Sequence, residues 1–581
     1  MGQLWKLTYN ILVYKLFQIF QLISFNFFSI LIAIVAGKIF LMLLRIKIST
    51  ISIFEQGLVG LTFIGFLSIF VNFFFSLNQF INSILTISFF LILIIKSNIK
   101  FILNNIKSIF LLSLFSSLLL IFSTVYAPDG SIYHIPYIKL LNDEKIIIGA
   151  SNINFRFGLN SIVQYISAFY NNYLFGEIGI TIPLVLIISF FIFFLYFEID
   201  NKFNSKGNYN IFYIIILFFF LISSIYQFSR YSEYGNDDPG HVYYFYLICL
   251  VLNYKNYKDK NLIFLIFTIS IFLIANKLFF ILSFIFPLYF LILNQDYNFF
   301  KNKLFMLIIF LFLIVILKNL MISGCFFYPV KEFCINSFDW TNINEVSLQS
   351  LEGEAWAKGW INQNIIIDFK EYSNNFNWLS AWFNVHFKVI IRKFLPVIIF
   401  ITSFFFILIF FNLNFVKKKN IKVKFTNHTY FIFIISIINF IFWFYKFPLY
   451  RYGYSFIAVF FIITSCIIFF SIFNKISFFY LRRIMLVILI LSFTGVITKN
   501  FQRILNNYNK NYFYYPWPNL LSLRLDNNYS SLVKVKVGES YYYYSKDGGC
   551  MYLESPCSNY LKKDLLYKKV ATYKVYYSDK F

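Results

Sequence analysis

Apolar runs long enough to cross a membrane recur along the chain from residue 16 to residue 498. A helix of about 17 to 25 apolar residues spans the hydrocarbon core of a bilayer. The pattern therefore predicts an all-α polytopic membrane protein with 13 or 14 transmembrane helices. The predicted spans lie near residues 16–36, 54–76, 80–95, 108–125, 178–197, 209–227, 241–252, 261–275, 277–293, 303–321, 394–413, 429–445, 452–473 and 483–498.

Charge alternates between successive loops and assigns them to sides of the membrane. Short Lys/Arg-rich loops stay in the cytoplasm. The basic loops lie near residues 38–47, 96–107, 202–206, 255–260, 301–303, 417–424 and 475–483. The other connections hold 14 of the chain's 25 acids and are 126–177, 228–240, 322–393 and 446–451. We therefore expect the acidic connections on the outer face.

The two ends of the chain are predicted to differ. At the N-terminus, Lys6 and Lys15 precede the first apolar run, which has no convincing small-residue cleavage site, so we expect an uncleaved span there. We predict a multi-spanning membrane domain over 1–498 and an external C-terminal segment over 499–581. That segment alternates like β-strands in three stretches, VKVKV at 533–537, YYYY at 541–544 and TYKVYY at 572–577. It is expected to form a small α+β or β unit.

Composition agrees with a membrane protein. Sixty per cent of the residues are hydrophobic, 23% are aromatic, 13% are charged and the mean hydropathy is +0.71, which excludes a soluble enzyme, a coiled coil and a disordered chain. The net charge of +25 does not indicate nucleic acid, because 41 of the 50 basic residues are Lys. Lys, Phe, Ile, Asn and Tyr share A/T-rich codons. The nine Arg are therefore the informative cations.

The six cysteines divide into two groups. Cys249 and Cys466 lie within predicted spans, and four others lie on the predicted outer face, where an oxidising compartment permits disulfides. The local pairs Cys325 with Cys334 and Cys550 with Cys557 are the first choice among three connectivities. Free thiols are the alternative.

Two outer loops carry the polar chemistry. Asp129 directly follows the predicted outer end of a span, between Pro128 and Gly130, which favour a turn. Tyr133, His134 and Tyr137 follow with the spacing of a short helix lying along the interface. A second loop holds Arg230, Glu233, Asp237, Asp238 and His241 close together in sequence.

Few features point to transport. Lys277 and Lys318 lie near predicted outer ends of spans, where snorkelling explains them. No paired intramembrane acids, no broken helices in matching halves and no P-loop are visible. An ATP-driven pump or a secondary transporter is therefore disfavoured.

The first outer loop resembles the GT-C superfamily of integral-membrane glycosyltransferases, in particular the protein mannosyltransferases and bacterial aminoarabinose transferases. The matching positions are Asp129, Tyr133, LLNDEKIIIG ending at Gly149, and FGLNSIVQYISAFYNNYLFG ending at Gly176. The loop departs from the family where Gly130 follows the Asp in place of an acid and where Phe157-Gly158 replaces paired prolines. The resemblance covers about 55 of 581 residues.

Four further stretches look like parts of uncharacterised bacterial multi-spanning proteins that share this first loop. They are GCFFYPV at 324–330, FDW at 338–340, RYGYSF at 451–456 and GGCMYLESPC at 548–557. They extend a weaker resemblance along the chain.

The resemblance implies a GT-C-like fold and inverting transfer of a sugar from a polyprenyl-phosphate-linked donor to an envelope acceptor. The reaction would take place at the outer face of a bacterial cytoplasmic membrane. Asp129 would remove the acceptor's proton, and arginines would bind the phosphate bidentately, which lysine does not do. The expected substrate-binding residues are Tyr133, His134, Arg156, Arg230, Asp237, Asp238, His241 and Arg451. We expect Asp129, Arg156, Arg230, Asp237 and Arg451 to meet in one cavity.

Several other interpretations stay open. Asp129 could be a turn residue, Asp237-Asp238-Pro239 could start a helix, and Arg451 could anchor its span at the interface. No metal ligands are assigned, although His134 and His241 could bind a divalent metal with Asp237 or Asp238. The alternative functions are a glycan polymerase, ligase or flippase of envelope polysaccharide pathways, or a non-enzymatic membrane scaffold. Neither the sugar nor the acceptor can be read from the sequence.

Overall fold

The computed structural model describes most of the chain, namely residues 2–121, 129–204, 211–227, 236–257, 261–294, 300–360, 368–415, 427–469, 478–508, 532–546 and 549–578. Within these ranges nine helices are long and apolar enough to cross a membrane. They are α1, α2, α4, α8 with the preceding η4, α13, the α16–α17 unit, α18, α19 and α21. The protein is therefore a multi-pass membrane protein.

Shorter apolar helices account for the remaining predicted spans. Four of them are found in the described ranges, α3, α9, α11 and the η5–α12 unit. The predicted span at 241–252 lies inside α10, which begins earlier, at Asp237. The last long helix, α21, continues to Tyr508 and so passes the predicted domain boundary at residue 498.

The bounds of the helices up to η5 are α1 (Gly2–Leu43), η1 (Ile48–Thr50), α2 (Ile53–Asn72), α3 (Gln79–Leu93), α4 (Lys96–Ile121), η2 (Gly130–His134), α5 (Ile135–Asp143), α6 (Ala150–Ile153), η3 (Phe155–Leu159), α7 (Ile162–Tyr170), η4 (Gly176–Thr181), α8 (Ile182–Asn204), α9 (Ile211–Gln227), α10 (Asp237–Tyr257), α11 (Leu262–Asn276) and η5 (Leu278–Phe284). The later helices are α12 (Ile285–Asn294), α13 (Lys303–Ser323), η7 (Lys331–Phe333), α14 (Ile343–Ala357), α15 (Phe369–Ser373), α16 (Leu379–Trp382), η8 (Phe383–Phe387), α17 (Lys388–Phe415), α18 (Asn427–Lys446), α19 (Tyr450–Ile468) and α21 (Phe478–Tyr508).

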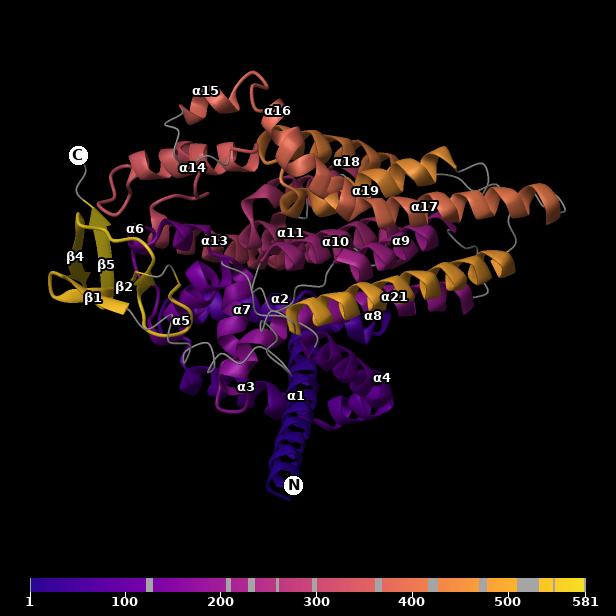
Figure 1. Cartoon of the computed structure of the whole chain (residues 1–581), viewed down its shortest axis with the longest axis horizontal. Helices are drawn as coiled ribbons and strands as arrows, with labels where there is room; N and C mark the ends of the chain where they lie inside the picture. The colour runs from indigo at the N-terminus through magenta and orange to yellow at the C-terminus, as the bar shows by residue number, and fades with distance from the viewer. Residues whose placement is uncertain are drawn as a thin grey trace.

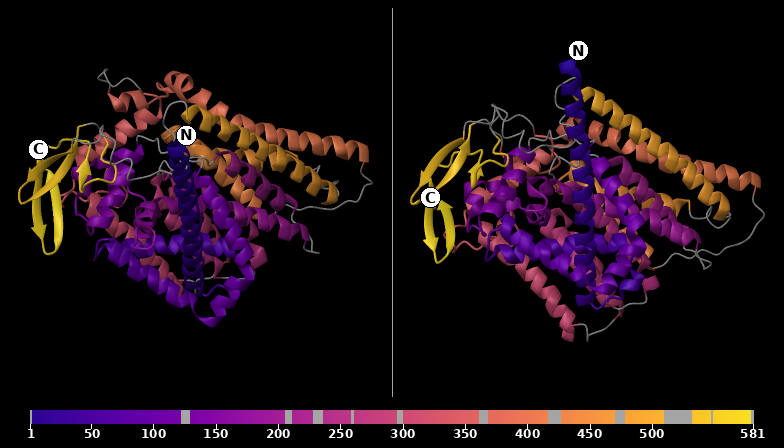
Figure 2. Two further views of the ribbon diagram at one scale, coloured as in Figure 1. Left: turned by 60° about the horizontal axis from the view of Figure 1, so that its bottom comes forward. Right: turned by 90° about the horizontal axis from the view of Figure 1, so that it is seen from below.

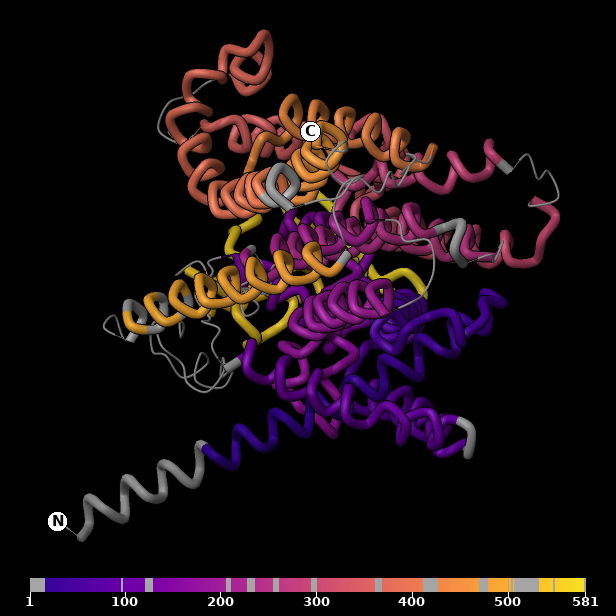
Figure 3. The backbone as a smooth tube through the Cα atoms, turned by 90° about the vertical axis from the view of Figure 1, so that its right-hand side faces the viewer, coloured from indigo at the N-terminus to yellow at the C-terminus, as the bar shows by residue number. Residues whose placement is uncertain are grey.

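The first helices and the late helices lie on opposite sides of the bundle. Figure 1 shows α1, α3 and α4 on one side, α17 to α19 on the opposite side, and α9 to α11 between them, and Figure 3 shows the same separation along the chain. The last helix, α21, packs against α9. Glycines let α1 and α2 approach closely. A Cβ on Gly37 would lie 1.8 Å from the Gln56 carbonyl oxygen, and one on Gly60 would lie 1.7 Å from the Ala33 carbonyl oxygen. Small residues at such crossings are typical of packing between membrane helices.

The C-terminal strands stand at one end of the bundle, close to α5, α6 and α14, while α17 and α21 extend toward the other end (Figures 1 and 2). The strands are β1 (Leu532–Val537), β2 (Ser540–Ser545), β3 (Cys557–Ser558), β4 (Leu565–Val570) and β5 (Tyr573–Ser578). β1 pairs with β2 and β4 with β5 in antiparallel hairpins, and β3 is parallel to β2. The three stretches predicted as strands are confirmed as β1, β2 and β5.

This β segment, residues 532–578, is bonded to the loop that follows α4. The N–H groups of Cys550 and Met551 both donate to the carbonyl of Ser131, at 3.0 Å. The Ile148 N–H donates to the Lys574 carbonyl (3.0 Å), and the Tyr576 N–H donates to the Ile148 carbonyl (2.9 Å). The β segment is therefore part of the same folded end as the residues that surround Asp129.

A lysine of the β segment also reaches the connection between α13 and α17. Lys562 forms an ion pair with Glu345 of α14, with 2.8 Å between Nζ and Oε1. Both partners are partly exposed, so the pair contributes little stability by itself. It does connect the β segment to a second loop region, which lies far from Ser131 in the sequence.

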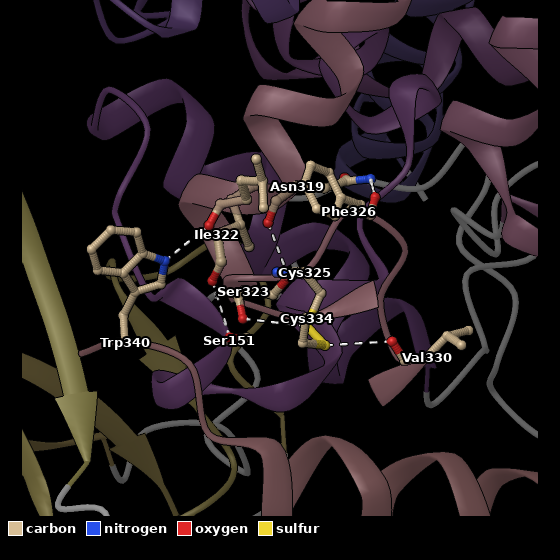
Figure 4. The surroundings of a disulfide bond; sticks show 10 residues. Ser151, Asn319, Ile322, Ser323, Cys325, Phe326, Val330, Cys334 and Trp340 are labelled. Carbon is tan, nitrogen blue, oxygen red and sulfur yellow. Dashed lines mark hydrogen bonds between the residues drawn. A yellow bond between two sulfur atoms is a disulfide. The ribbon is translucent and has the colours of Figure 1, made fainter. Parts of the chain in front are cut away.

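Two disulfides cross-link this end of the molecule, Cys325–Cys334 and Cys550–Cys557. They are the two local pairs that the sequence favours. Figure 4 shows the first, next to Ser151 of α6, whose hydroxyl donates to the Ile322 carbonyl at 3.0 Å. Cys249 and Cys466 are free and buried within helices.

Candidate functional site

A cavity of about 400 Å³ opens where several helices begin or end. Asp129 immediately precedes η2, Asp237 starts α10, Lys277 separates α11 from η5, and Arg451 lies in the first turn of α19. Seven residues expected to act at the site line this main cavity: Asp129, Tyr133, His134, Asp237, Asp238, His241 and Arg451. Segments far apart in the sequence therefore meet there.

Arg451 lies between two carboxylates. Its Nη1 donates to Asp129 Oδ2 at 2.8 Å, and its Nε lies 3.9 Å from Asp237 Oδ2. The guanidinium also packs over two rings, with its Cζ 5.4 Å from the Trp356 centroid and 5.3 Å from that of Tyr452. Planar contacts of this kind suit a guanidinium and not an ammonium group.

The charge state of Asp129 follows from its neighbours. Burial raises the pKa of the Asp129 carboxyl, but the charge of Arg451 and its hydrogen bond, with a contribution from Arg156, outweigh burial and hold this pKa below its ordinary value. Asp129 is therefore an ionised carboxylate at neutral pH. For Tyr133, burial and the charge of Asp129 raise the pKa of the hydroxyl, which stays protonated as a donor.

His134 is a buried, neutral side chain. Its Nδ1 lies 3.2 Å from Gln164 Nε2 and 3.3 Å from Asn236 Nδ2. Both neighbours are amide donors, so Nδ1 accepts and the proton resides on Nε2. Burial, together with the charge of Lys277, lowers the pKa of His134 to about 3.

His241 holds the start of α19 in place. Its Nε2 lies 2.7 Å from the Arg451 carbonyl oxygen, to which it must donate, and its Nδ1 lies 2.9 Å from Ser455 Oγ. Both ring nitrogens are therefore engaged by protein atoms. Among the described residues no group of three or more His, Cys, Asp or Glu side chains is placed to hold a metal ion. The idea that His134 and His241 share a metal with Asp237 or Asp238 thus finds no support in this geometry.

The two other arginines behave differently from Arg451. The Arg156 guanidinium lies over the Tyr133 ring, 5.0 Å from its centroid, so it is a neighbour of the main cavity and does not line it. Arg230 and Glu233 lie outside the described residues. Of the five residues expected to meet, Asp129 and Asp237 each pair with Arg451, and Arg156 is adjacent through Tyr133.

The two lysines near predicted span ends contact polar groups of the protein, and the burial of Lys318 contradicts snorkelling at that position. Lys277 lines the main cavity with its Nζ 3.6 Å from Asp237 Oδ1. Lys318 is only 1% exposed, and its ammonium donates to Asn160 Oδ1. Both lysines thus pair with polar side chains that come from other segments of the chain.

Several residues of the main cavity escaped sequence reasoning, namely Trp356, His386, Arg392 and Lys393. They come from α14, η8 and α17, which reach the cavity from the long connection after α13. Arg392 carried a usable signal, since it is one of only nine arginines and lies at the predicted outer end of a span. The others carried none.

One comparison with known proteins places the chain. A family model described as "Domain of unknown function (DUF8201)" matches residues 19–458. Comparisons with curated proteins and with solved structures found no match. The matched range contains every residue that lines the main cavity, and the β segment lies beyond it.

Proposed function

The chain belongs to the DUF8201 family, and since that description assigns no activity, we propose the function from the site itself. We propose that the protein is a GT-C-like glycosyltransferase that moves a sugar from a polyprenyl-phosphate-linked donor to an envelope acceptor. The observation that carries the proposal is the Asp129–Arg451 pair, at the wall of a cavity formed where apolar helices end. The proposed location is a bacterial cytoplasmic membrane, with the cavity on the outer side.

The proposed reaction is an inverting displacement. The acceptor oxygen forms a bond to the anomeric carbon, the bond from that carbon to the phosphate oxygen breaks, and the electron pair leaves with the phosphate. Asp129 takes the acceptor's proton, for which an ionised carboxylate is required. Lys277, Arg392, Lys393 and Arg451 line the same cavity and would stabilise the charge on the departing phosphate.

Arg451 can take part in both halves of this reaction. A guanidinium has five N–H donors. One of them donates to Asp129 at 2.8 Å and another to the Tyr452 hydroxyl at 3.4 Å. Nε is buried beside Asp237, so the second N–H of Nη1 and the second N–H of Nη2 would donate to a phosphate oxygen. A lysine at this place could not hold a carboxylate and a phosphate in fixed directions at once. The choice of arginine in a Lys-rich chain supports this role.

The orientation of the protein in the membrane gives a first prediction. Single cysteines at Tyr173 and Leu561, which are 70% and 50% exposed, should react with a membrane-impermeant maleimide in intact cells. A cysteine at the exposed Ser49 should react only after permeabilisation, because it follows a basic loop. The native cysteines give little background, since they are disulfide-bonded or buried. Labelling of Ser49→Cys but of neither other variant in intact cells would reverse the proposed orientation.

The charge of Arg451 gives a second prediction, on pH dependence. The carboxyl of Asp129 must be ionised to act as the base, so kcat/KM falls on the acid side as pH drops through its pKa. In Arg451→Gln, burial remains and the opposing charge is gone, which raises this pKa. The acid limb, normalised to each variant's own maximum, should shift to higher pH by roughly one to three units.

The control for this shift is Arg482→Gln. Arg482 pairs with Asp200, far from the cavity, with 3.2 Å between Nη2 and Oδ1. The acid limb of the pH profile of Arg482→Gln should match that of the parent. Identical acid limbs in Arg451→Gln and the parent would show that Asp129 does not control the rate.

A further inference from the structure

A second cavity lies beside the main one and has a volume of about 170 Å³. It is lined by η3, by the turn between α11 and η5, by α13 and by the loop closed by the Cys325–Cys334 disulfide. Lys277 and Tyr452 line both cavities, so the two spaces meet at these side chains. Nothing in the proposed role of Asp129 and Arg451 accounts for this second space.

Three asparagine side chains line the second cavity and are held in place. Asn160 Nδ2 donates to the Phe157 carbonyl at 2.9 Å, and its Oδ1 accepts from Lys318. Asn276 Nδ2 donates to the Asn236 carbonyl at 2.8 Å, and its Oδ1 accepts from the Ser161 hydroxyl. Asn319 Nδ2 donates to the Phe326 carbonyl at 2.9 Å.

Each of these amides keeps capacity for a ligand. An amide carries two N–H donors and two acceptor lone pairs, and the bonds described above use only part of them. Because the side chains are already fixed, a ligand binds them without ordering them first. Fixed groups that both donate and accept suit a ligand rich in hydroxyl groups.

Among its described lining residues, the second cavity has no unopposed charge. Among the residues described as lining it, Lys277 alone is charged, and its ammonium lies 3.6 Å from Asp237 Oδ1. That positive charge is thus already opposed by a carboxylate. The cavity therefore suits a neutral ligand, whereas the described lining of the main cavity carries four cations and three carboxylates.

Aromatic rings form the apolar walls. Phe279, Tyr328 and Tyr452 line the second cavity. A Cβ added at Gly158 would lie 2.6 Å from Tyr328 Cε1, so the absence of a side chain at Gly158 lets the ring pack there. This is the position where Phe157-Gly158 departs from the paired prolines of GT-C enzymes. Flat rings next to a few fixed polar groups are a common arrangement for small-ligand recognition.

We propose that the second cavity binds a neutral sugar ring, with its hydroxyls on the Asn160, Asn276 and Asn319 amides and its apolar face on the aromatic walls. The inference rests on the proposed sugar transfer for the class of ligand. The ring belongs either to the acceptor, with its attacking hydroxyl directed past Lys277 and Tyr452 toward Asp129, or to the donor. The chemistry of recognition is the same for both.

The test uses the purified full chain in nanodiscs and needs no transfer activity. The probes are the methyl glycosides of glucose, galactose, mannose and N-acetylglucosamine, and saturation-transfer NMR measures their binding. At least one should bind with a dissociation constant on the order of 1 mM. Leu159 lines the second cavity and is 39% exposed, so Leu159→Trp narrows its mouth without disturbing the core. This variant should weaken binding by about tenfold or more.

A second variant and a matched control complete the test. Asn319→Ala removes one amide and should weaken binding by roughly two- to tenfold. Leu174 is 43% exposed and lines neither described cavity, so Leu174→Trp should bind like the parent. Absence of glycoside binding by the parent, or equal binding by Leu159→Trp and the parent, would overturn the proposal.

Transfer kinetics separate the two sources of the ring and the two proposals. With a lipid-linked donor, Leu159→Trp should raise KM for the acceptor if the acceptor's sugar occupies the cavity, and KM for the donor if the donor's sugar does. If Asp129→Asn stays active while Leu159→Trp still weakens glycoside binding, the proposed transfer mechanism is wrong and the sugar subsite stands. If Asp129→Asn is inactive and the parent binds no glycoside, the transfer mechanism stands and the sugar subsite is wrong.

Discussion

Asp129→Asn is expected to lower kcat for transfer from a lipid-linked sugar by roughly 10²- to 10⁴-fold, with donor affinity little changed. The amide keeps the size of the side chain and an oxygen that can accept from Arg451, but it cannot take a proton from the acceptor. The measurement is a transfer assay with purified protein and titrated donor. Asp143→Asn is the matched control, since Asp143 lies in the same connection between α4 and α8 and pairs with Lys139 at 2.9 Å on the surface. Full activity of Asp129→Asn would remove the catalytic assignment and leave the fold resemblance without its chemistry.

Arg451→Lys should lower kcat by roughly 10²-fold although it conserves the charge. The ammonium group loses the fork that bridges Asp129 and Asp237 and the flat surface that packs on Trp356 and Tyr452. The backbone at residue 451 should stay in place, because the hydrogen bond from His241 Nε2 goes to the carbonyl of residue 451 and does not involve its side chain. Thermal unfolding of the variant should therefore resemble that of the parent.

Arg482→Lys is the control for this conservative exchange and should keep its activity. Arg482 is 54% exposed at its side chain and pairs with Asp200 away from the cavity. If Arg451→Lys were as active as Arg482→Lys, Arg451 would be an interfacial anchor, as its place in the first turn of a span also permits.

Local patterns were enough to predict the apolar helices and three of the five described strands of this fold. The length of each apolar run specifies a helix because backbone groups in a membrane must be satisfied within the segment. Period-two alternation likewise identified β1, β2 and β5. The sequence around Asp237 allowed two roles, a helix-initiating acid and a residue of the site. The structure shows both, because Asp237 starts α10 and also contacts Arg451.

The composition of the cavities could not be predicted in the same way. Lys277 has the same sequence surroundings as a snorkelling lysine, and only the arrival of Asp237 from another helix distinguishes the two cases. Trp356 and Arg392 reach the main cavity through the long connection that follows α13, and the path of that connection depends on packing. The resemblance of one loop to a known family predicted Asp129, and the rarity of arginine gave a signal for Arg392, whereas Trp356 carried no signal in the sequence.

The bonds from Cys550 and Met551 to Ser131 impose an order on biosynthesis. A chain is made from its N-terminus, so Asp129 is synthesised long before the segment that holds the neighbouring Ser131 carbonyl. In the proposed orientation, the loop that carries the proposed base lacks this support until the last span has been inserted and the C-terminal residues have crossed the membrane. Incompletely translated or incompletely translocated chains would thus hold a main cavity whose catalytic loop is not yet fixed. Maturation of the site is in this sense coupled to completion of the polypeptide.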